Sequence, residues 1–127
     1  MEKGLPMRRE PFVKHTAEYL WEQPDAGHVD GAYSKMLVNP GSGAKHVDYR
    51  ISCYQPKAHV AAHKHRIQEQ IYHVLQGEGM MELDGLRRVV RRHDVIFIPP
   101  GVEHALHNTG FEDLVFIVVT SPASDEG

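Results

Sequence analysis

Short hydrophobic runs, rich in Val, Ile, Tyr and Phe, alternate with polar positions along most of the chain from residue 33 onward. Gly, Pro, Asn and Asp separate the runs roughly every ten residues, and no long stretch repeats with the period of a helix. This pattern predicts strands and favours a small antiparallel sandwich or barrel. The eight predicted strands are Tyr33–Val38, Val47–Tyr54, Ile71–Leu75, Met80–Leu83, Arg87–Val90, Val95–Ile98, His104–His107 and Leu114–Thr120.

The 127 residues predict a single domain, because they contain no internal repeat, low-complexity tract or long linker. Asp84-Gly85 lies between two alternating segments, which is the signal of a two-residue hairpin turn. We expect an N-terminal arm over residues 1–32, irregular or with a short helix capped by Thr16. A barrel over residues 33–120 and a C-terminal tail over residues 121–127 follow it.

Composition and charge narrow the class of protein. The formal net charge of −3 gives no support to a nucleic-acid or anionic-membrane partner. The longest apolar run, Leu114–Val119, is too short to span a bilayer, and the charged, proline-broken first residues are not those of a signal peptide. The single cysteine, Cys53, cannot form an intramolecular disulfide. These features predict a soluble, cytoplasmic protein.

The run Leu114–Val119 also bears on assembly. It is apolar at both sets of alternating positions, and a strand that faces water on one side is polar at one set. This composition predicts a strand covered on both sides, by the barrel core and by a second subunit. We therefore expect a homodimer.

Histidine is the unusual feature of the composition, with ten residues in the chain. His63 and His65 are two positions apart in a segment that the pattern predicts to be extended, so their imidazoles point to the same side. Gln70 follows at the start of the next strand, and His104 comes from a later strand after a Pro-Pro-Gly turn. Because imidazole is the commonest metal ligand, this arrangement indicates a metal site inside the barrel.

Two motifs in this region resemble those of the cupin superfamily. The first, G-x5-H-x-H-x3,4-E-x6-G, is followed from His63-x-His65 to Gly77, and the second, G-x5-P-x-G-x2-H-x3-N, from Pro99 to Asn108. The resemblance covers roughly residues 33–120 and implies an all-β fold, a six- to eight-stranded antiparallel jelly-roll barrel. It also implies a metal inside the barrel.

The chain departs from the cupin motifs at three positions. Lys57 and His93 replace the opening glycines, which lie in turns, so we expect altered loops and an intact fold. Counting back from Gly77 places Gln70 where the family has its acidic ligand. Glu69 is the alternative ligand, but neighbouring residues of a strand face opposite ways, so both cannot point at the metal.

The resemblance implies His63, His65, Gln70 and His104 as the metal ligands. Nitrogen and oxygen ligands without a thiolate suit one divalent transition metal: iron, manganese, nickel, copper, cobalt or zinc. Four such ligands leave two adjacent positions of an octahedral metal open. Because all four are neutral, they favour an anionic small-molecule substrate that binds through two oxygens.

Acid–base groups are less evident than metal ligands. His59 shares strand parity with His63, and Tyr72 shares it with Gln70, so these two residues are the candidates for catalysis. Both also have a purely structural interpretation, at a strand edge for His59 and in the core for Tyr72. No Asp or Glu is predicted to face inward.

Three classes of function remain open from the sequence. One is a Lewis-acid isomerase or lyase acting on a sugar acid or hydroxy acid, which needs a proton donor near the metal. Another is a dioxygenase acting on a dicarbonyl or enol, which tolerates an apolar pocket. The third is a non-catalytic small-molecule-binding or sensory domain, and the intact histidines His63, His65 and His104 argue against a metal-free form of it.

Overall fold

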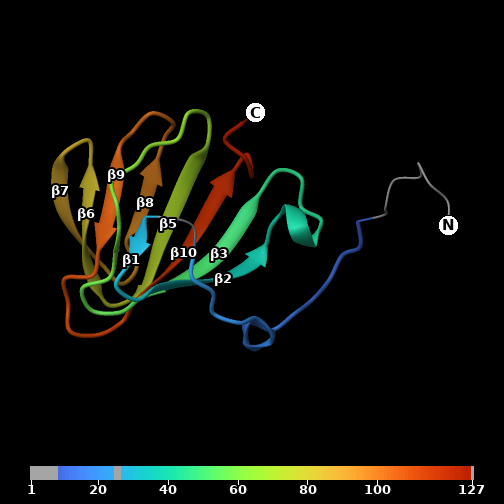
Figure 1. Ribbon diagram of the computed structural model, residues 1–127, viewed down its shortest axis with the longest axis horizontal. Coiled ribbons are helices and arrows are strands. Elements are labelled where there is room, and N and C mark those ends of the chain that lie inside the picture. The colour runs from blue at the N-terminus through green and yellow to red at the C-terminus, as the bar shows by residue number, and fades with distance from the viewer. Residues whose placement is uncertain (1–8, 25–26, 127) are drawn as a thin grey trace.

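The computed structural model describes residues 9–24 and 27–126, and its strands form two five-stranded antiparallel sheets (Figure 1). The strand orders are β1-β4-β9-β6-β7 and β2-β3-β10-β5-β8. Most neighbours within a sheet are far apart in sequence, as in a jelly roll. The strands are β1 (His28–Val29), β2 (Ala32–Val38), β3 (Asp48–Tyr54), β4 (His59–Val60), β5 (Glu69–Gln76), β6 (Glu78–Leu83), β7 (Leu86–Arg91), β8 (Val95–Ile98), β9 (His104–His107) and β10 (Leu114–Ser121).

All eight predicted strands are confirmed, and β1 and β4 are two additional short strands. β1 lies inside the predicted N-terminal arm and pairs with β4. The arm's only helix among residues 9–24 and 27–32 is a 3-10 turn, η1 (Thr16–Glu18), capped by His15 where we expected Thr16. Figure 1 shows this part of the arm, in blue, outside the two sheets. A second 3-10 turn, η2 (Pro40–Ser42), follows β2. No helix in the described part of the chain is long and apolar enough to cross a membrane.

The alternation that predicted the strands also builds the core. Along β10, Leu114, Phe116 and Val118 are buried, and the residues between them are half-buried. They pack in one cluster with residues of the other sheet, such as Met81 and Leu106, so the two sheets face each other. Burying a side chain of this size stabilises the fold by about 1.5–3 kcal/mol.

The outer face of the second sheet is unusually apolar. Ile71, Val95 and Phe97 are exposed on it, while Ile117 and Val119 of β10 are half-buried. Ile71 pairs with both Phe97 and Val119, so these side chains form a continuous patch. The homodimer remains a prediction, and this patch is the surface through which we expect the two subunits to associate.

Two turns show how local chemistry sets the backbone. Asp84 and Gly85 both have positive φ, 49° and 82°, which is the conformation of the tight hairpin predicted between β6 and β7. Lys57 and His93 also have positive φ, 76° and 80°. Both residues have the left-handed conformation that glycine favours, and the fold is intact as we expected. Gly77 is required for space, because a Cβ there would lie 2.6 Å from the Asp113 carbonyl oxygen.

Candidate metal centre

Three of the predicted ligands come together at one end of the barrel interior. The ligand atoms of His63, His65 and His104 all lie within 4.8 Å of one another. An antiparallel bridge holds two of the residues: the His63 N–H donates to the His104 carbonyl at 3.0 Å, and the His104 N–H donates back at 2.8 Å. The backbone therefore fixes the approach of these two imidazoles before any metal binds.

Backbone carbonyls determine which ring nitrogen of two histidines is available. His63 Nδ1 lies 2.8 Å from the Ala61 carbonyl oxygen, and His104 Nδ1 lies 2.9 Å from that of Val102. A carbonyl only accepts, so each Nδ1 carries the proton and each Nε2 keeps its lone pair. These tautomers are the ones that suit a metal bound at Nε2.

Two of the clustered histidines, His65 and His104, are in the neutral form that a metal ligand requires. Burial is the main cause that lowers the pKa of His104 to about 4; the nearby His63 and His65 also lower it, and a backbone hydrogen bond to Val102 raises it. Burial likewise lowers the pKa of His65. The nearby Gln70 side chain acts in the opposite direction and raises the pKa of His65, although neither His65 Nε2 nor Gln70 Oε1 has a hydrogen-bond partner of its own. Both imidazoles are therefore uncharged at neutral pH.

Gln70, and not Glu69, lies with the histidines. Its side chain is 8% exposed, whereas Glu69 is exposed on the other face of β5. Gln70 Nε2 donates to Thr120 Oγ1 at 3.0 Å, and Oε1 has no hydrogen-bond partner. The strand register that favoured Gln70 from the sequence is thus the register of the fold.

Three buried atoms at this centre have no hydrogen-bond partner, and they are the only such side-chain atoms in the described part of the chain: His65 Nε2, Gln70 Oε1 and His104 Nε2. Leaving a buried polar atom unsatisfied costs about 1–3 kcal/mol. One divalent cation would satisfy all three atoms at once, and the donor set of imidazole nitrogens and an amide oxygen suits a transition metal. The residues present therefore fit a metal ion.

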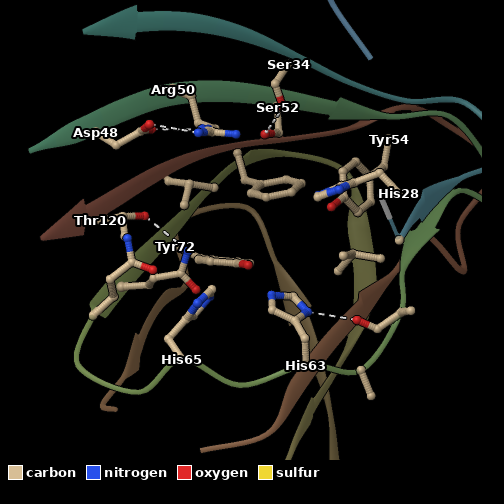
Figure 2. A pocket seen from close by; sticks show the side chains of 18 of the residues that line it. His28, Ser34, Asp48, Arg50, Ser52, Tyr54, His63, His65, Tyr72 and Thr120 are labelled. Atoms are coloured by element: carbon tan, nitrogen blue, oxygen red, sulfur yellow. Dashed lines mark hydrogen bonds and ion pairs between the residues drawn. The ribbon is translucent and has the colours of Figure 1, made fainter. Parts of the chain in front are cut away.

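A cavity of about 400 Å³ adjoins the centre. Figure 2 shows His63 and His65 on one side of it and, on the other, a polar wall from β3 with Ser34 of β2 beside it. In this wall, Arg50 donates to both Asp48 carboxylate oxygens at 2.8 Å. The Ser34 and Ser52 hydroxyls are hydrogen bonded to each other at 2.8 Å.

We did not predict from the sequence that this polar wall lines the cavity. The available signal was the regular spacing of Asp48, Arg50, Ser52 and Tyr54 on one side of a predicted strand. Only the pairing of β3 with β10 shows that this side faces inward, because Ser52 pairs with the buried Phe116.

The two predicted catalytic residues have different positions. Tyr72 lines the cavity and meets the His104 ring edge-on, with 6.3 Å between ring centroids. His59 is not among the cavity-lining residues; its ring stacks on that of His107 at 4.9 Å. The structure therefore brings Tyr72 to the site and leaves His59 away from it. Tyr54 joins Tyr72 on the cavity wall.

The C-terminal tail fastens the loop that connects two of the ligands. The Asp125 carboxylate accepts backbone N–H bonds from Arg66, Ile67 and Gln68 at 2.7, 2.7 and 3.1 Å. Gln68 Nε2 in turn donates to the Pro122 carbonyl at 3.1 Å. This loop joins His65 to Gln70, so the contacts of the tail lie between two of the proposed ligands.

We expect Asp125→Asn to weaken metal binding by about tenfold, the lower end of effects at residues that support ligands. An amide cannot accept all three N–H bonds, because its NH₂ group only donates. These backbone bonds hold the pKa of Asp125 at about 2, so the carboxylate is ionised in the folded and unfolded states above about pH 5. The stabilisation of the folded state by this carboxylate is therefore complete above about pH 5, and it is lost as the pH falls toward 2.

Metal titration at pH 7 followed by calorimetry tests this expectation. Glu126→Gln removes the same charge from the neighbouring position and serves as the control. Equal metal affinities for Asp125→Asn and Glu126→Gln would show that the tail does not position the ligands.

The fold and the site together define a class of protein: a jelly roll of two facing sheets with a histidine cluster between them. The chain matches the Cupin domain family over residues 50–120, which is more than half of its length. It therefore belongs to that family, as the motifs predicted.

Two curated relatives match part of the chain. An oxalate-binding protein of Thermotoga maritima is 38% identical over 64 residues, 50% of this chain and 53% of that protein. An uncharacterised protein of Methanocaldococcus jannaschii is 38% identical over 60 residues, 47% of this chain and 48% of that protein. The matched segments thus span about half the length of these relatives.

Solved structures agree with the fold over most of the chain. A predicted oxalate decarboxylase from Thermotoga maritima has a TM-score of 0.79 at 26% identity, covering 87% of this chain and 99% of that one. KdgF from Halomonas sp. has a TM-score of 0.77 at 20% identity, covering 92% and 98%. The polyketide cyclase RemF from Streptomyces resistomycificus has a TM-score of 0.79 at 22% identity, covering 88% and 80%. The last two likenesses show the fold alone.

Proposed function

We propose that this protein is a metal-dependent enzyme acting on a small anionic, oxygenated substrate, with one divalent transition metal held by His63, His65, Gln70 and His104. The observation that carries the proposal is the convergence of three unpaired buried atoms, His65 Nε2, Gln70 Oε1 and His104 Nε2, beside a cavity. The names of the oxalate-binding protein and the predicted oxalate decarboxylase support an anionic substrate, because oxalate is a small carboxylate.

The charge of the site supports the same substrate class. All four proposed ligands are neutral, so they leave the charge of a bound divalent ion uncompensated. A metal held in this way supplies Lewis-acid polarisation of a substrate oxygen. Anions are the ligands that such a centre attracts.

The chain's own contribution is hydrogen-bond donation. Burial raises the pKa of Tyr72, and burial together with Tyr72 raises that of Tyr54 well above its usual range. The charge of Arg50, which lines the same cavity, acts in the opposite direction on both. Each Oη therefore keeps its proton at neutral pH, and these protons can stabilise negative charge on a substrate oxygen.

Lewis-acid isomerase or lyase chemistry is the reaction class that we favour. A dioxygenase tolerates a cavity with few polar groups, but this cavity has Arg50, Asp48 and two tyrosines on its walls. Arg50 and the two tyrosines supply hydrogen-bond donors to a substrate oxygen, which Lewis-acid chemistry uses. Dioxygenase chemistry is the alternative, and non-catalytic binding is the third outcome of the test.

The test follows turnover of sugar acids, hydroxy acids and dicarbonyls by metal-loaded protein, with and without oxygen. We expect turnover without oxygen, and we expect Tyr72→Phe to lower kcat by about tenfold at unchanged metal content. The loss is partial because the Tyr54 hydroxyl remains. Oxygen uptake would assign the alternative reaction, and binding without turnover would make the protein a binding domain.

A further inference from the structure

The polar wall of the cavity is a regular row on β3. Asp48, Arg50 and Ser52 occupy alternate positions and line the cavity. Asp48 pairs with Thr120 of β10, which pairs in turn with Gln70 of β5. The row therefore lies two strands away from a proposed ligand, or about 10 Å at the usual spacing between strands.

The row offers both donors and acceptors but little net charge. The opposite charges of Arg50 and Asp48 are paired through two bonds of 2.8 Å. Each Asp48 oxygen accepts one of these bonds, and a carboxylate oxygen has a second lone-pair direction. The Ser34 and Ser52 hydroxyls, bonded to each other at 2.8 Å, can each donate and accept.

Such a surface suits hydroxyl groups better than a second anion. A hydroxyl both donates and accepts, so it can bond to a carboxylate, a guanidinium or a serine. A second carboxylate on the substrate would meet the like charge of Asp48. Stability alone does not require the row either, because apolar residues in place of a poorly exposed ion pair are often neutral or stabilising.

We propose that the row formed by Asp48, Arg50 and Ser52 binds the hydroxyl groups of a polyhydroxylated carboxylic acid, whose carboxylate end lies at the histidine cluster. This inference rests on the proposed function and narrows its substrate to sugar acids. The cavity of about 400 Å³ is in the size range of small-molecule sites.

Two ligands of equal chain length test the inference. D-Gluconate and 2-hydroxyhexanoate share the 2-hydroxycarboxylate end, and only gluconate has hydroxyls along the rest of its chain. Calorimetry on nickel(II)-loaded protein measures both affinities. We expect gluconate to bind about tenfold more tightly, a factor that one or two well-made hydrogen bonds supply.

Variants of the row show whether it causes the preference. The double variant Ser34→Ala and Ser52→Ala removes both hydroxyls, so neither is left buried without its partner. We expect it to lose most of the preference for gluconate and to bind 2-hydroxyhexanoate as before. Asp48→Asn, which keeps the shape of the side chain, is a second variant in case the first does not fold. Tyr49→Phe removes a hydroxyl from the opposite face of β3, where Tyr49 pairs with Val119, and should keep the preference.

The outcomes separate this inference from the proposed function. Equal affinities in the wild type, or a preference that both row variants retain, would overturn the polyhydroxy-acid subsite alone. Failure to take up nickel, or to bind either ligand when loaded, would overturn the proposed function and this inference with it.

Discussion

His104→Ala is expected to lose its metal, with affinity falling by more than about 100-fold, while the fold persists. The variant removes one of the proposed ligands, whose side chain is 1% exposed at the centre of the cluster. The backbone bridge to His63 does not depend on the side chain, so β9 stays in place. The cost to folding is the Val102 carbonyl left without its 2.9 Å bond, about 1–3 kcal/mol.

Elemental analysis and thermal unfolding measure the two effects separately. Wild-type protein should retain about one equivalent of metal, and metal at 100 times its Kd should stabilise it by about 2.7 kcal/mol, a gain that the variant lacks. His107→Ala is the matched control, because His107 is on the same strand but is not among the cavity-lining residues. Metal retained in His104→Ala and lost in His107→Ala would place the site elsewhere.

The sequence was sufficient to predict the strands and the histidine cluster. Alternation along a strand reports which side chains share a face, and in β10 it separates the buried positions from the half-buried ones. The spacing of His63 and His65, with the motif around His104, predicted a cluster that the structure contains. Local patterns carry this information because it concerns single strands.

The same reasoning fails where a strand is interrupted. His59 was assigned to the face of His63 by counting alternate positions, but β4 ends at Val60. Beyond that residue the backbone is no longer extended in a regular strand, so the period of two does not continue. His59 instead lies opposite His107 in the β4–β9 pairing.

The polar wall and the Asp125 contacts depend on long-range pairing. A row of polar residues on a strand is usually the solvent-facing side, and only the register with β10 shows that Arg50 and Ser52 face the cavity. Asp125 bonds to residues 57 to 59 positions earlier in the chain. No local pattern in the sequence marks that contact.

Gln70→Glu is expected to tighten metal binding on the order of 100-fold and to slow turnover by about tenfold. The variant places a carboxylate where Oε1 now lies, and unit charges 4 Å apart attract by about 4 kcal/mol at an effective dielectric constant of 20. Desolvation of the carboxylate offsets part of this gain. The added negative charge weakens the polarisation of a substrate oxygen, so the tighter site is the slower one.

Proton release on metal binding distinguishes the electrostatic effect of Gln70→Glu from a change in packing. In the metal-free variant the introduced carboxyl group would be buried beside the Thr120 hydroxyl, and burial raises the pKa of a carboxyl group, so that metal binding must release a proton. Calorimetry in two buffers of different ionisation enthalpy should detect this release in the variant and not in the wild type. Glu69→Gln, which changes the exposed neighbour on β5, should alter neither affinity nor proton release. If Glu69→Gln weakened metal binding and Gln70→Glu left it unchanged, Glu69 would be the ligand, and the register of β5 at the site would be one residue from the one described.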